Sequence, residues 1–140
     1  MDIKIPEKLL KEAVRFHGHL GPFMILGLKA GLLANKLLGK DYFKTKAIIT
    51  TKPKTPYTCF LDGIQFATGC TVGKGNIRLE KGEGILTVLF IKDNKRLKLT
   101  LKADLLKKIE KISMEECEQV ARDLQKTPIE DLFHITENHS

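Results

Sequence analysis

The chain has 140 residues, of which 42% are hydrophobic and 29% are charged. This composition suits one folded domain with a hydrophobic core and excludes a mostly disordered chain. The formal net charge is +7, but the lysines are scattered and no aromatic residue interleaves with the basic segment 92–111, which argues against a nucleic-acid-binding protein.

The number of cysteines and the charged N-terminal residues indicate the cellular compartment in which the protein is expected. Three cysteines cannot all pair within one chain, and the charged N-terminus does not form a secretory signal. We therefore expect a cytoplasmic protein whose cysteines are ligands, nucleophiles or core residues rather than disulfides. The most apolar run, 20–38, contains two lysines and an asparagine, so we expect no membrane span.

Two helices are predicted in the N-terminal third. Apolar residues recur at helical spacing after Pro6, and Gly18 is placed to end this first helix. A second helix is expected from Gly21-Pro22 to about Leu38.

The second helix should be largely buried. Glycines at 27 and 31 share one face, which indicates close approach by a neighbouring backbone. One stripe of lysines is expected to face solvent: Lys29, Lys36 and Lys40.

Strands and one helix follow in the middle of the chain. The β-branched run 46–52 predicts a strand, and Thr58 is a candidate N-cap for a helix over 59–68. A short strand is expected at 77–79, and a buried central strand at 85–91. Asp93-Asn94 is typical of a two-residue hairpin turn.

The C-terminal third returns from strand to helix. Segment 96–102 alternates, with its leucines expected to face inward. Asp104 is a candidate cap for a helix to about 112, and Ser113 opens a capping-box pattern for another helix that ends before Pro128. Segment 129–135 is expected to dock as a final turn. We predict an α+β protein with one domain over 1–135 and a frayed tail over 136–140.

Two histidines flank a glycine at the predicted end of the first helix. This spacing would let the imidazoles of His17 and His19 face one point, as a metal ion requires. The alternative is that His17 is a partly buried helix-end residue and His19 contacts carbonyl groups near the helix end.

Cys59 is expected in the first turn of a helix, where the helix dipole lowers a thiol pKa and suits a nucleophile or a metal ligand. Asp62 and Gln65 follow at spacings that place a carboxylate and an amide beside this thiol. The alternatives are a small buried hydrophobic Cys59 and two surface polar residues. The other cysteines are Cys70, just past this helix, and Cys117, which we assign to the core.

The glycine-rich segment 69–76 resembles a phosphate-binding loop only superficially. Its glycine spacing is too short, and it follows a helix instead of preceding one. Two interpretations of this segment stay in play. One is a backbone nest that holds an anion with help from Lys74, and the other is a plain glycine-rich turn.

Three segments together resemble the FmdE family of formylmethanofuran dehydrogenase subunits. They are the N-terminal motif Phe16-His17-Gly18-His19-Leu20-Gly21-Pro22, the central motif made of 62–65 and 68–76, and Asp131-Leu132-Phe133. The order and extent of these segments identify most of the chain as this family's core domain. Members commonly carry a cysteine at the position of Gly21, and many carry a C-terminal zinc finger, which we do not expect in this protein.

The resemblance implies an α+β core with a mixed sheet, similar to the catalytic domain of glyceraldehyde-phosphate dehydrogenase. It also implies a Cys/His metal site between the two motifs, frequent homodimers, and partnership with other subunits of a molybdenum or tungsten enzyme. Zinc is the expected metal, with nickel, iron and cobalt as alternatives. The expected ligands are His17, His19, Cys59 and Cys70.

The leading hypothesis is a metal-binding protein accessory to formylmethanofuran dehydrogenase or a related one-carbon oxidoreductase of methanogenesis. Cys59, Asp62 and Gln65 are the candidate catalytic residues, and Lys74 and Asn76 are the candidate cofactor-binding residues. The alternatives are a stand-alone enzyme that uses a Cys59 nucleophile or a metal-bound water, and a structural protein whose site has decayed.

Overall fold

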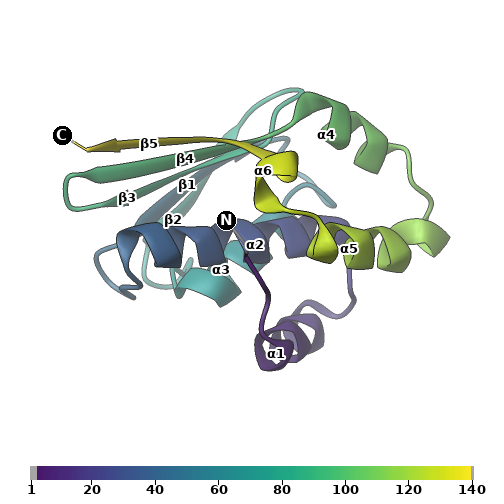
Figure 1. Cartoon of the computed structure of the whole chain (residues 1–140), viewed down its shortest axis with the longest axis horizontal. Helices are drawn as coiled ribbons and strands as arrows, with labels where there is room; N and C mark the ends of the chain where they lie inside the picture. Colours follow the sequence, from purple (N-terminus) through teal and green to yellow (C-terminus); the bar gives the residue numbers. More distant parts are fainter. Residues whose placement is uncertain (1–2, 140) are drawn as a thin grey trace.

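One mixed β-sheet forms the framework of the protein (Figure 1). The structure is a computed structural model that describes residues 3–139. The strand order is β2-β1-β3-β4-β5; β1 and β2 are parallel, and the other neighbours are antiparallel. The strands are β1 Lys46–Thr51, β2 Ile77–Lys81, β3 Thr87–Lys92, β4 Lys95–Leu101 and β5 Phe133–His139.

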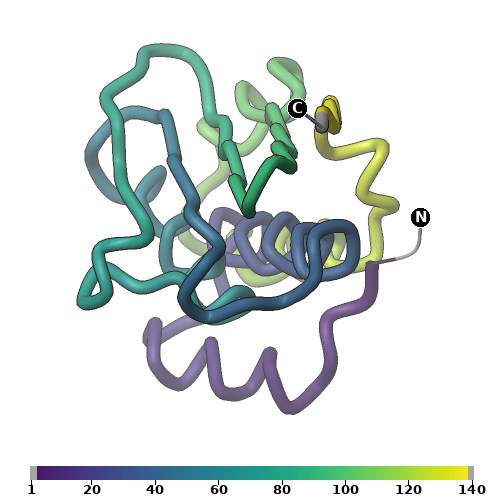
Figure 2. The backbone as a smooth tube through the Cα atoms, turned by 90° about the vertical axis from the view of Figure 1, so that its left-hand side faces the viewer, coloured from purple at the N-terminus to yellow at the C-terminus, as the bar shows by residue number. Residues whose placement is uncertain are grey.

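The helices complete an α+β architecture, as predicted. Figure 2 shows α2 in the middle of the molecule, with α1 on one side of it and the strands on the other. The helical elements are α1 Glu7–His17, α2 Pro22–Leu38, α3 Cys59–Thr68, α4 Ala103–Glu110, the 3₁₀ turn η1 Met114–Glu116, α5 Cys117–Lys126 and α6 Ile129–Leu132.

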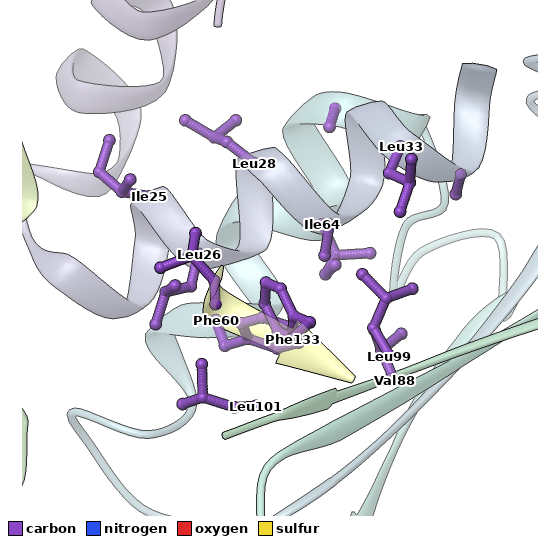
Figure 3. Close-up of a cluster of buried hydrophobic side chains, with 14 of the residues drawn as sticks. Ile25, Leu26, Leu28, Leu33, Phe60, Ile64, Val88, Leu99, Leu101 and Phe133 are labelled. Carbon is purple, nitrogen blue, oxygen red and sulfur yellow. The ribbon is translucent and has the colours of Figure 1, made fainter. Parts of the chain in front are cut away.

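The core lies between α2, α3 and the sheet (Figure 3). Leu26 of α2, Phe60 of α3 and Phe133 of β5 are buried there beside Leu99 and Leu101 of β4. Burial of such side chains stabilises the fold by about 2 kcal/mol each. The leucines of β4 face inward because successive strand residues alternate between the two faces, which confirms the prediction from the alternating segment.

Glycines bring α2 and α3 into backbone contact. A Cβ on Gly27 would lie 2.2 Å from the carbonyl oxygen of Phe60, and a Cβ on Gly63 would lie 2.2 Å from that of Met24. Any larger residue would therefore push the helices apart. The close approach predicted from the glycines of the second helix is confirmed.

Lys29 is buried, so the prediction that it faces solvent is wrong. Its side chain is enclosed at the C-terminal end of α5, where Nζ donates hydrogen bonds to the carbonyl oxygens of Leu124 and Gln125, both at 3.1 Å, and of Thr127. A cation is favourable at this end of a helix because the last carbonyl groups have no partner within the helix. Helical periodicity could not reveal these distant acceptors.

The C-terminal segment also differs from the prediction. The final turn predicted over 129–135 is present as α6 over 129–132. Residues 133–139 then form β5, which pairs with β4 from Leu101↔Phe133 to Lys95↔His139, instead of the rest of that turn and a frayed tail. The tail prediction for Ser140 lies outside the described residues. A second difference is the start of α4, where Lys102 occupies the N-cap position and Asp104 makes no side-chain cap. The capping box at Ser113 and Glu116 is confirmed.

The hairpin between β3 and β4 confirms the predicted turn. Lys92 pairs with Lys95, which leaves Asp93 and Asn94 as the two loop residues. Asp93 has a φ of +54°, the left-handed conformation that such turns require. Over residues 3–139, no helix is both long and apolar enough to span a bilayer.

Candidate functional site

A cavity of about 440 Å³ opens where three separate segments meet. The segments are the α1–α2 junction, the loop that leads into α3, and the connection from α4 to α5. The lining residues are His17, His19, Gly21, Pro22, Phe23, Thr55, Pro56, Tyr57, Cys59, Ile109, Glu110, Ile112, Met114 and Cys117. The two predicted histidines therefore do share one cavity with Cys59.

His17 is held in place by Asp62. Its Nδ1 lies 2.6 Å from Oδ2 of Asp62, and only 8% of the histidine side chain is exposed. His17 ends α1, and Gly18 follows with a φ of +103°, which turns the chain sharply after the histidine. Asp62 lies in the first turn of α3, so the hydrogen bond joins two helices. The carboxylate fixes the ring orientation and favours the tautomer with the proton on Nδ1.

The other ring nitrogen of His17 is available. Nε2 is buried and finds no hydrogen-bond partner among the described residues. With Nδ1 donating to Asp62, Nε2 carries a lone pair that can bind a metal ion or accept a hydrogen bond. A buried polar atom without a partner is costly, so Nε2 is a candidate position for contact with a ligand.

His19 lies against His17. The two ring centroids are 4.8 Å apart, and the ring planes are inclined by 36°. The imidazole of His19 also lies close to Gly21, where an added Cβ would come within 2.7 Å of His19 Cε1. Glycine at this position therefore leaves room for the His19 ring in the observed orientation.

Cys59 lines the cavity, but its thiol is not activated in this structure. Burial and, to a lesser degree, the negative charge of Asp62 raise the pKa of Cys59 above its ordinary value. This direction is opposite to the one expected from the position of Cys59 at the helix start, and its causes are burial and the charge of Asp62. The direction of the shift counts against a free thiolate nucleophile.

Cys70 is placed elsewhere. It follows the C-terminal end of α3, whereas Cys59 begins that helix, so about 15 Å of helix separates them. Cys70 is fully buried, and its thiol donates to the carbonyl oxygen of Thr45 at 3.3 Å. Within residues 3–139, no group of three or more His, Cys, Asp or Glu side chains is arranged to hold a metal ion.

The glycine-rich loop is held by contacts within itself and with its neighbours. Gln65 Oε1 accepts from the backbone N–H of Val72 at 3.0 Å, and Asn76 Oδ1 accepts from that of Thr71 at 2.8 Å. Lys74 Nζ donates to the carbonyl oxygens of Tyr42, at 2.6 Å, and Gly69. Gln65, Lys74 and Asn76 were predicted as site residues, but none of them lines the cavity. The plain-turn interpretation accounts for all of these contacts.

Among the cavity residues that sequence reasoning missed, three are titratable: Tyr57, Glu110 and Cys117. Cys117 is half-buried at the cavity, not in the core, and its thiol donates to the Ser113 carbonyl oxygen at 3.5 Å. Tyr57 donates from its hydroxyl to Oε2 of Glu110 at 2.5 Å, and this hydrogen bond raises the tyrosine pKa. The capping box at Ser113 was the one sequence signal near Cys117. The Tyr57–Glu110 pair spans 53 residues and left no local signal.

Comparison with known proteins identifies the protein family. Residues 16–137 match the family described as "FmdE, Molybdenum formylmethanofuran dehydrogenase operon". The chain belongs to this FmdE family, which confirms the resemblance drawn from the sequence motifs.

One similar protein comes from Archaeoglobus fulgidus and is named as a probable S-adenosyl-L-methionine-binding protein. The two sequences are 34% identical over 104 residues. The match covers 72% of this chain but only 28% of the Archaeoglobus protein, which is therefore much longer.

Proposed function

We propose that the protein binds a transition-metal ion at the His17 end of the cavity. The observation that carries this proposal is the Asp62–His17 pair, in which Nδ1 is held at 2.6 Å and Nε2 is buried without a partner. A histidine that ligates a metal through one nitrogen commonly donates its other N–H to a carboxylate, which raises its basicity as a ligand.

The proposed donors are His17, His19 and Cys59, which all line the same cavity and would have to move closer together to ligate one ion. Cys70 is left out of the proposed set, since its thiol is committed to Thr45 on another part of the protein. Imidazole and thiolate donors favour zinc, with nickel, iron and cobalt as alternatives. Such an ion, when bound, would supply Lewis-acid chemistry or an acidic bound water.

Metal binding is tested by elemental analysis of protein purified without added metal, followed by titration with Zn²⁺ and Co²⁺. We expect His17→Ala to lose at least tenfold in affinity. His134→Ala is the matched control, because His134 lies exposed on β5 and does not line the cavity. A thiolate-to-cobalt absorption band that disappears in Cys59→Ser would place Cys59 among the ligands. Equal metal affinity in the native protein and His17→Ala would refute the proposal.

We also propose an accessory role beside a molybdenum or tungsten one-carbon oxidoreductase, with the chain as a homodimer. Membership of the FmdE family supports the association. Large apolar side chains on the surface supply contact area, since Phe16, Phe43 and Met114 are each at least 70% exposed. Sedimentation analysis of the native chain and Phe43→Ser tests the dimer. If the native chain is a monomer at micromolar concentration, the proposed homodimer is rejected.

A second candidate function is binding of an organic cofactor in the cavity. The name of the Archaeoglobus protein suggests S-adenosylmethionine, and the cavity of about 440 Å³ with aromatic walls suits an organic molecule. Calorimetric titration with S-adenosylmethionine tests this candidate in metal-free and zinc-loaded protein. If neither form gives a heat of binding, this candidate function is rejected.

A further inference from the structure

The cavity differs in charge from the rest of the chain. Lysine and arginine make up 24 of the 140 residues, yet neither occurs among the fourteen described residues that line the cavity. The one lining side chain with a formal charge at neutral pH, histidines apart, is Glu110. Among these lining residues, a ligand that carries an anionic group would therefore meet a carboxylate and no lysine or arginine.

An aromatic wall stands next to this carboxylate. The rings of Phe23 and Tyr57 have centroids 5.4 Å apart and are tilted by 51°, and the Tyr57 hydroxyl is bonded to Glu110. Aromatic faces attract cations, and the attraction grows when water is excluded. The Tyr57 ring already attracts one cation of the protein itself, since Lys52 Nζ lies 5.9 Å from its centroid.

The remaining walls are apolar. Ile109 is buried, and Ile112 and Met114 continue the surface along the connection from α4 to α5. Pro22, at the start of α2, has no backbone N–H, so this helix begins with one donor fewer for an anion. The polarity of these walls thus favours a ligand with an apolar body.

We infer that the cavity selects small organic cations, with the apolar body against Phe23 and Ile109 and the positive group beside Tyr57 and Glu110. This inference goes beyond the proposed metal site, because it concerns cavity residues that are not among the proposed metal ligands. It deepens the second candidate function by naming the ligand's charge, but it does not need that cofactor to be the ligand.

Three phenols of similar shape provide a direct test. They carry a para substituent that is cationic in (4-hydroxyphenyl)trimethylammonium, neutral in 4-tert-butylphenol and anionic in 4-hydroxybenzenesulfonate. Each is titrated into chelator-treated protein and followed by NMR shifts and calorimetry. We expect the cation to bind about threefold more tightly than the neutral phenol. The sulfonate should bind most weakly of the three.

Two variants separate charge from shape. Glu110→Gln should reduce the preference for the cation and leave 4-tert-butylphenol unaffected, whereas Glu80→Gln, at an exposed position of β2, should change neither affinity. Ile112→Trp should weaken all three phenols by filling the space for the body. Sulfonate binding equal to that of the cation, or an undiminished cation preference in Glu110→Gln, would overturn the inference. Because metal is absent throughout, failure here is distinguishable from failure of the metal proposal.

Discussion

Gly27 of α2 and Gly63 of α3 face each other so closely that a Cβ built on Gly27 would lie 3.0 Å from Gly63 Cα. This contact sets the distance between the two helices that carry the site. Pro22 and Phe23 line the cavity from the start of α2, and Cys59 lines it from the start of α3.

The first prediction concerns this contact. Gly63→Ala would place its methyl group 2.2 Å from the Met24 carbonyl oxygen, and backbone cannot move aside as a flexible side chain can. We expect a loss of about 2–3 kcal/mol in the free energy of unfolding, despite the better helix propensity of alanine. Urea denaturation measures the loss. Gly73→Ala is the control, since nothing lies within 4 Å of its Cβ, and a similar loss there would contradict the argument.

Lys29 gives the second prediction. Lys29→Met keeps the length of the side chain but removes the donor to the three carbonyl groups at the end of α5. We expect about 3 kcal/mol of destabilisation, because buried acceptors lose their partner. Lys36→Met, on the exposed part of the same helix, should change stability by no more than about 0.5 kcal/mol. Faster amide exchange at the end of α5 in Lys29→Met would locate the effect, and unchanged exchange there would contradict it.

The third prediction tests how Asp62 supports His17. Asp62→Asn keeps the size of the side chain but removes the carboxylate that orients the ring. If the metal binds at His17, its affinity should fall about 10–100-fold. Asp104→Asn on α4 is the control, because that carboxylate is exposed and outside the cavity. Zinc titration against a competing chelator gives both values, and equal affinities would separate Asp62 from the metal site.

The fourth prediction follows from the raised pKa of Cys59. At any pH below that value, a raised pKa leaves less thiolate in the folded protein than in the unfolded chain, so alkylation by iodoacetamide should be slow at pH 7–8. The rate should rise as the pH increases beyond the ordinary thiol value of about 8.5. Asp62→Asn should speed the reaction, since it removes a charge that raises this pKa. Mass spectrometry of the Cys117→Ser background measures the rate at Cys59. Labelling at pH 7 as fast as that of an unfolded peptide would contradict the direction of the shift.

Local patterns in the sequence predicted much of the fold. The alternation in β4, the two-residue turn at Asp93 and the glycines of α2 each depend on neighbours in the chain, and each is confirmed. β5 was missed because its segment mixes polar and apolar residues, and its strand form depends on pairing with β4 more than thirty residues away.

The site was predictable only in part. His17, His19 and Cys59 could be grouped through the family motifs, and they do line one cavity. Cys70 and Lys74 belong to the same motifs, but they donate hydrogen bonds to the carbonyl oxygens of Thr45 and Tyr42. The spacing of residues within the motif could not predict these acceptors. Cys117 and Glu110 enter the cavity from the C-terminal half, and their approach depends on how α4 and α5 pack.

The cavity walls come from residues near 20, near 57 and near 112, so its construction has a consequence for how the protein is made. During synthesis, the pocket cannot exist until the ribosome has released the chain well past Cys117. A molecule that binds there holds the early and late parts of the chain together and shifts the balance toward the fully folded form. A ligand in the cavity would thus bind only to the fully folded chain and would stabilise that form.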